Sequence, residues 1–85
     1  MLSKKDSITL RKFGKHLKAL RLAKDLKFRE LSALSNINTA DLVKYENGET
    51  GPNLVTLKKL ATGLKVHPAE LLDFDFGVEF TGGIE

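Results

Sequence analysis

Apolar residues three and four positions apart recur along most of the chain, and this spacing constrains the fold more than any other feature. It is the spacing of helices that each bury one face. Two runs show it most clearly: Leu10, Phe13, Leu17 and Leu20, and then Leu54, Leu57, Leu60 and Leu64. Turn and capping residues between the apolar runs predict five helices, over 8–24, 28–35, 39–47, 53–64 and 66–73. Short helices joined by short loops indicate a compact all-α domain.

The length and composition narrow the class of protein. A chain of 85 residues suits a single domain, and the absence of cysteine excludes disulfides and thiolate metal sites. No apolar run reaches the roughly 18 residues of a membrane span, and the N-terminus has no signal-peptide core. We therefore expect a cytoplasmic protein without a membrane partner.

Positive charge is concentrated in the first third of the chain. Residues 1–30 carry ten Lys and Arg against three acidic residues, whereas residues 31–85 carry four against eight. A basic half on a small domain indicates a polyanionic partner such as nucleic acid. A solvated, lysine-rich helix face is the alternative interpretation.

The stretch LVKYENGETGP at 42–52 contains an acid where a helix should not favour one. Gly48 is suited to the left-handed conformation that ends a helix. Glu46, however, stands in the last helical turn, at the negative end of the helix dipole. A carboxylate in this place needs another reason, such as a basic partner from elsewhere in the fold.

Three segments resemble the Cro and phage-repressor family, also called XRE-like. They are FGKHLKALR at 13–21, LSALSNINTADLVKYENG at 31–48 and NLVTLKKLATGLKVHPAELL at 53–72. The resemblance covers roughly residues 10–72 and implies a five-helix, lambda-repressor-like domain with a helix-turn-helix. It also implies that Glu46 pairs with Arg21 of the first helix, which explains the unusual acid. We expect this structural ion pair to be largely buried.

The sequence departs from the family pattern at four positions. Phe28 replaces a glutamine that commonly contacts DNA, so one contact is in doubt. Asn36 replaces the turn glycine, a substitution that the backbone tolerates. Ser32 replaces a small alanine of the second helix, and Asp25 replaces a glycine often found between the first two helices.

The resemblance places the DNA-reading residues at the start of the third helix. In a helix-turn-helix this recognition helix lies in the major groove and its first residues meet base edges. Lys44 is our first choice for a base contact, because lysine can donate to guanine O6 and N7. The predicted base contacts are Asn38, Thr39, Ala40, Asp41 and Lys44. The predicted phosphate contacts, including backbone N–H groups at the start of the second helix, are Lys27, Phe28, Arg29, Asn47 and Gly48.

The function implied by the resemblance is a sequence-specific transcriptional regulator, expected to be a repressor, that binds a palindromic operator as a homodimer. The alternative is an antitoxin or adaptor that uses the same fold chiefly to hold a protein, such as a toxin or another regulator. Exposure of Thr39 and Lys44 beside the basic face of the first helix would favour DNA binding. We expect no enzyme activity, cofactor or metal, because His16 and His67 lack ligand spacing and no phosphate-binding glycine loop is present.

The ends of the chain lie outside the resemblance. Residues 1–7 are expected to form a flexible basic arm, residues 8–73 the helix-turn-helix domain and residues 74–85 a tail. Strict alternation in FDFGVEF at 74–80 is typical of a half-buried strand. We expect this strand to pair with a second subunit through Phe74, Phe76, Val78 and Phe80, with the surface around Leu71 as the next candidate for the dimer contact. A tail folded back onto its own helices, or a disordered tail, remains open.

Overall fold

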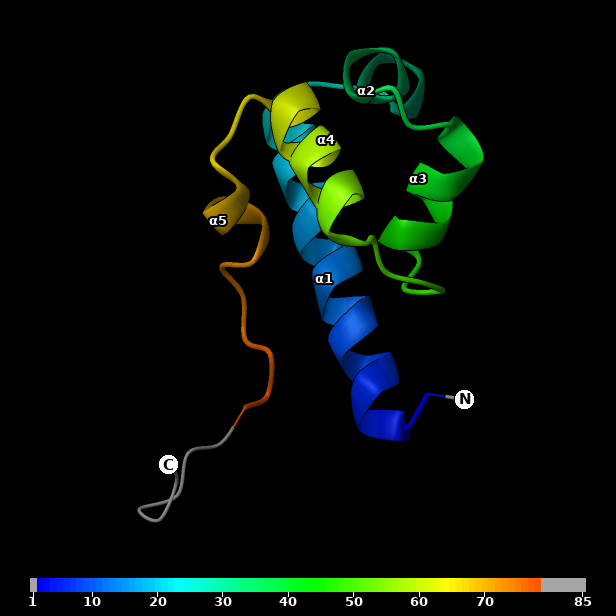
Figure 1. Cartoon of the computed structure of the whole chain (residues 1–85), viewed down its shortest axis with the longest axis vertical. Coiled ribbons are helices and arrows are strands. Elements are labelled where there is room, and N and C mark those ends of the chain that lie inside the picture. Colours follow the sequence, from blue (N-terminus) through cyan, green and yellow to red (C-terminus); the bar gives the residue numbers. More distant parts are fainter. Residues whose placement is uncertain (1, 79–85) are drawn as a thin grey trace.

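The computed structural model describes residues 2–78, and within that part of the chain it contains five α-helices and no strand. Figure 1 shows α1 running along the molecule, with α3 and α5 on opposite sides of it. The predicted all-α, lambda-repressor-like class is confirmed. The helices span Lys4–Ala23 (α1), Phe28–Ser35 (α2), Thr39–Glu46 (α3), Leu54–Leu64 (α4) and Pro68–Leu71 (α5).

Leucines from every helix form the core. Each lies on the apolar stripe of its own helix, so packing of the stripes removes all of them from water. Such burial is worth about 1.5–3 kcal/mol for each leucine side chain. The fully buried leucines are Leu17, Leu31, Leu42, Leu60, Leu64 and Leu71.

The largest differences from the predicted helix boundaries are in α1 and in α5, which starts at Pro68 and not at residue 66. The Oγ of Ser3 accepts the N–H of Asp6 at 3.1 Å, so an N-cap starts α1 at Lys4, before the predicted residue 8. Residues 4–7, predicted to be a loose arm, are therefore helical. At the other end of the chain α5 stops at Leu71, two residues before the predicted end.

The two turns before the recognition helix use the left-handed conformation. Asn36, which joins α2 to α3, has φ of 59°, and Asp25, between α1 and α2, has φ of 57°. Asn and Asp tolerate this conformation better than other residues with a side chain. The two residues therefore stand in for glycine, as predicted for Asn36.

The part of the tail that the structure describes, residues 74–78, contains no strand, and pairing of the tail with a second subunit stays a prediction. Residues 74–78 form no ladder, and Gly77 turns the chain at φ of +78°. Phe74 instead packs on α1, with its ring centroid 6.0 Å from that of Phe13 and 5.7 Å from that of His16. The interpretation of a tail folded back onto its own helices describes this contact. Phe80 lies outside the described residues.

Candidate nucleic-acid interface

The recognition helix α3 presents three of its predicted base-reading side chains to solvent. Thr39, Ala40 and Lys44 are exposed on its outer side, while Leu42 and Tyr45 are buried beneath it. A helix of eight residues with one buried face offers its opposite face to a groove. These three side chains therefore form the exposed surface of α3 that is predicted to read bases, called the reading surface below.

The other two predicted base contacts, the exposed Asn38 and the partly buried Asp41, are bonded to each other. Asn38 caps α3, because its Oδ1 accepts the N–H of Asp41 at 2.8 Å. Its Nδ2 donates to the Asp41 carboxylate at 3.1 Å. The pair closes the first turn of α3, so a main role of Asn38 and Asp41 is to fix the start of the helix.

The predicted ion pair between Arg21 and Glu46 is present and buried. The Nε of Arg21 donates to the Glu46 carboxylate at 2.6 Å, and its Nη2 donates to the second oxygen at 3.1 Å. The two side chains are only 8% and 4% exposed. A bidentate pair of this kind fixes both distance and orientation. The last turn of α3 is therefore held to α1.

Two further contacts of the Arg21 guanidinium complete its surroundings. Its Nη1 donates to the carbonyl of Leu26 at 2.7 Å. The ring of Phe28 lies 4.1 Å from the guanidinium carbon, a cation–π distance. Phe28 was predicted to contact phosphate, but its side chain packs inward against Arg21 and the core. Only its backbone N–H remains for that role.

A glycine lets α1 and α3 approach each other closely. A Cβ on Gly14 would lie 2.6 Å from the carbonyl oxygen of Tyr45 and closer still to that of Glu46. No other residue fits at this crossing without displacing the backbone of α3. The sequence pattern contained this glycine, but only the structure shows what it touches.

The predicted phosphate contacts differ in whether their donor groups are already bonded within the protein. Lys27 and Arg29 are exposed at the start of α2. The backbone N–H of Asn47 donates to Val43 at 2.9 Å, and that of Gly48 donates to Tyr45 at 3.1 Å. Both donors therefore serve the end of α3. The side-chain amide of Asn47 is exposed, and its Nδ2 lies 3.4 Å from the Glu49 carboxylate, so this donor would have to leave Glu49 to bind a phosphate.

Arg11 belongs to this surface although sequence analysis did not single it out. A Cβ on Gly48 would lie 2.7 Å from the Cγ of Arg11, so the arginine stem lies against Gly48, the second residue after α3. Lys15 and Lys18 stand four and seven positions further along α1, on the same side of the helix. The basic side of α1 thus adjoins the end of α3. The spacing 11, 15, 18 would have indicated this stripe.

Lys12, by contrast, faces the tail. Its Nζ lies 3.3 Å from the carboxylate of Asp75. The basic residues of α1 are therefore divided between two sides of the helix, and Lys12 lies on the side away from α3.

The histidines have structural contacts. The Nδ1 of His67 accepts the N–H of Ala69 at 3.0 Å and caps α5, and His16 contacts the carbonyl of Glu70. Within residues 2–78 no three His, Asp or Glu side chains are placed to hold a metal ion. None of the helices in the same range has the length and apolarity to cross a membrane.

Comparison with known proteins identifies the family. A helix-turn-helix family model matches residues 17–71. The chain is 46% identical, over 55 residues (64% of its length and 40% of the relative's), to the uncharacterized HTH-type transcriptional regulator RghRB of Bacillus subtilis. It is 39% identical over 66 residues, 76% of its length and 48% of the relative's, to the HTH-type transcriptional repressor RghR of the same organism.

A solved structure extends the similarity to the fold. The restriction-modification controller protein C.AhdI from Aeromonas hydrophila matches with a TM-score of 0.71 and 40% identity, over 73% of this chain and 94% of that one. The chain spans less than half the length of the two Bacillus relatives. The chain belongs to the helix-turn-helix family, in its Cro/repressor-like (XRE-like) branch.

Proposed function

We propose that this protein is a sequence-specific transcriptional repressor that binds a palindromic operator as a homodimer. The observation that carries the proposal is the rigid seating of α3. The Arg21–Glu46 pair and the close approach at Gly14 hold its last turn, while Thr39, Ala40 and Lys44 stay exposed. A reading helix must be held in this way for its side chains to meet base edges in register.

Electrostatics support DNA over a protein as the main partner. Arg11, Lys15 and Lys18 lie on the side of α1 that adjoins the end of α3, and Lys27 and Arg29 begin α2. Lysine and arginine beside a reading helix are suited to the phosphates that flank its bases. Similarity to RghR, which is a transcriptional repressor, and to the controller protein C.AhdI agrees with a regulatory role. An antitoxin or adaptor would not need this arrangement.

Selection of bound sequences from a random pool of double-stranded DNA tests the proposal. We expect an enriched palindrome with half-sites about 10 base pairs apart, centre to centre. Binding should weaken steeply with salt, because each neutralised phosphate contributes roughly −0.9 to the log–log slope. Failure to enrich any sequence would favour the protein-binding alternative.

Substitution of Lys44 tests the reading surface directly. Lys44→Ala is expected to cost about 1–3 kcal/mol at one base position of the selected operator and little on random DNA. Lys59→Ala, which removes an exposed lysine from α4, is the matched control and should leave both affinities unchanged. Lys27→Ala should weaken all sequences alike. Equal weakening of operator and random DNA by Lys44→Ala would contradict its role in base reading.

The dimer contact is proposed to lie on the exposed edge of the tail. Leu71 is fully buried and Phe74 packs on α1, so neither side chain is available to a second subunit. Phe76 and Val78 remain 41% and 62% exposed. Val78→Glu places a charge on this edge and is expected to convert a micromolar dimer to monomer in light scattering. A Val78→Glu protein that stays dimeric would move the contact elsewhere, for example to the exposed Leu72.

A further inference from the structure

The first turns of α1 are set apart from the core. The buried residues of this helix begin at Phe13, and residues 4–12 include none. Figure 1 shows this half of α1 extending beyond α3 and α4, with the tail alongside it. A few helical turns without packing are marginal in water. These turns therefore rest on few contacts: those of Leu10 and Arg11 with the loop after α3, and those that the tail supplies.

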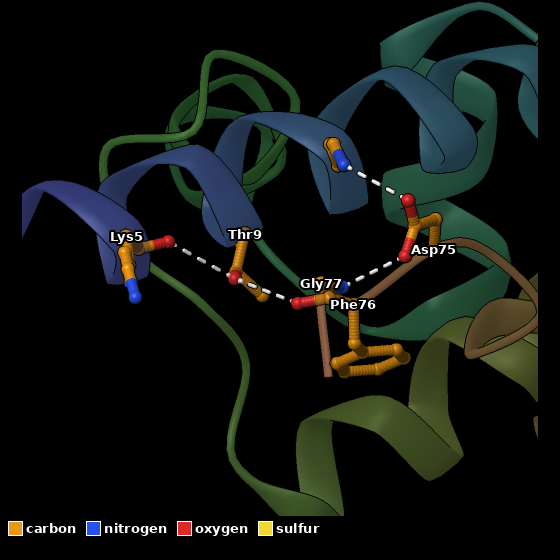
Figure 2. Close-up of polar contacts among 6 residues, drawn as sticks. Lys5, Thr9, Asp75, Phe76 and Gly77 are labelled. Carbon is orange, nitrogen blue, oxygen red and sulfur yellow. Dashed lines mark hydrogen bonds and ion pairs between the residues drawn. The ribbon is translucent and has the colours of Figure 1, made fainter. Parts of the chain in front are cut away.

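The tail supplies polar contacts on one side of these turns, as Figure 2 shows. Lys12 pairs with Asp75 at 3.3 Å, and the Thr9 hydroxyl lies 3.4 Å from the carbonyl oxygen of Phe76. The other Asp75 oxygen accepts the N–H of Gly77 at 2.8 Å. This N–H first, and then Lys12, lower the pKa of Asp75 below its ordinary value. The carboxylate thus joins the turn of the tail to α1.

Aromatic packing anchors the same segment. Phe74 lies against Phe13 and His16, and Phe76 stacks on Phe74 with 4.2 Å between ring centroids. Aromatic pairs of this kind are favourable beyond the area that they bury. Phe74 is half-buried and Phe76 more exposed, so the inner ring is the anchor.

The opposite side of these turns faces the candidate interface. Arg11 contacts Gly48 at the end of α3, and Lys4 stands seven positions before Arg11 on the same side of α1. One short helical segment therefore carries tail contacts on one side and basic residues on the other. Tail contacts that keep this segment helical therefore also fix the positions of Lys4 and Arg11.

We propose that residues 74–77 form a strap that keeps the first turns of α1 helical, and that release of this strap lowers the affinity for DNA. The second half of this statement rests on the proposed function. With the strap released, Lys4 and Arg11 lie on a helix end that frays, and their contacts with phosphates are lost from the complex. Affinity falls because each lost contact removes its share of the counterion release that favours binding. A molecule that binds Phe74 and draws it away from α1 would release the strap and so lower the affinity for DNA.

Hydrogen exchange in the full chain tests the first half of the proposal. Phe74→Ala is compared with Leu22→Ala, which removes an exposed apolar side chain from the other end of α1. In Phe74→Ala we expect the amides of residues 7–12 to exchange at least about tenfold faster, with a smaller change in α4. Leu22→Ala should not produce this difference. Equal acceleration in both helices, or none in residues 7–12, would overturn the strap.

DNA binding of the same variants tests the second half. Loss of the contacts of Lys4 and Arg11 should make the log–log salt slope of Phe74→Ala less steep by about 0.9 for each contact, up to about 1.8. Phe74→Tyr, which keeps the ring, should restore the wild-type slope. Faster exchange with an unchanged slope would overturn the link to DNA. A wild-type protein that binds no DNA would refute the proposed function and this link together, while exchange would still decide the strap.

Discussion

Glu46→Ala is expected to destabilise the domain by about 3–5 kcal/mol, because it leaves the Arg21 guanidinium buried without its carboxylate. The guanidinium would keep the Leu26 carbonyl and the ring of Phe28, neither of which carries a compensating charge. In a domain of this size the melting temperature should fall by more than about 12 °C. Thermal unfolding followed by circular dichroism measures this loss.

A control variant and a double variant show whether the loss of stability comes from the unpaired buried charge of Arg21. Glu49→Ala removes an exposed acid from the loop just beyond α3 and should change the melting temperature little. Arg21→Met combined with Glu46→Leu removes both charges and should recover part of the loss, since a buried pair can be replaced by apolar side chains. A Glu46→Ala protein that melts like Glu49→Ala would show that the pair contributes no stability.

The sequence indicated a partner for Glu46 on physical grounds, and its family resemblance identified that partner. Glu46 lies at the unfavourable end of the dipole of α3, so local electrostatics could not account for it. A local conflict of this kind indicates a tertiary partner, and the family resemblance supplied Arg21. Apolar spacing together with turn and capping residues likewise predicted all five helices, because burial of one helix face leaves a regular spacing in the chain. Leu54, on the stripe predicted to be buried in α4, is however 81% exposed.

The features that could not be predicted depend on contacts between distant segments. The helical start at Lys4 was missed because Ser3 is one of several polar residues, and only the hydrogen bond to Asp6 shows that it is the cap. The tail was predicted as a strand from its alternation. That pattern equally suits a segment that packs one aromatic, Phe74, onto a helix. The spacing of apolar residues within a segment does not show which part of the fold those residues will pack against.

The position of the candidate site could be predicted from the sequence, but the separate roles of its residues could not. Sequence analysis placed five base contacts at the start of α3. In the structure Thr39, Ala40 and Lys44 are exposed, and Asn38, which is also exposed, is hydrogen-bonded to Asp41. A polar residue at a helix start can read DNA or cap the helix, and its identity is compatible with both.

Gly14→Ala is expected to destabilise the domain, although helix propensity alone predicts the opposite. In an exposed helix position alanine is about 0.8–1.0 kcal/mol better than glycine. At Gly14, however, a Cβ would lie 2.6 Å from the Tyr45 carbonyl oxygen and 2.8 Å from the Glu46 carbonyl carbon. Both are backbone atoms, which cannot rotate away as a side chain can. The helices must therefore separate, at a cost of about 1–3 kcal/mol or more.

Ala19→Gly is the matched variant, because residue 19 is exposed on the same helix. It should destabilise the domain by about 0.8–1.0 kcal/mol through helix propensity alone. Glycine is then preferred at position 14 and alanine at position 19. Urea unfolding of both variants measures the two free energies. Separation of α1 from α3 also moves the Arg21–Glu46 pair, so Gly14→Ala should weaken operator binding whereas Ala19→Gly should not. A Gly14→Ala protein more stable than the wild type would show that the two helices can part at no cost, and that the close approach at Gly14 does not position the recognition helix.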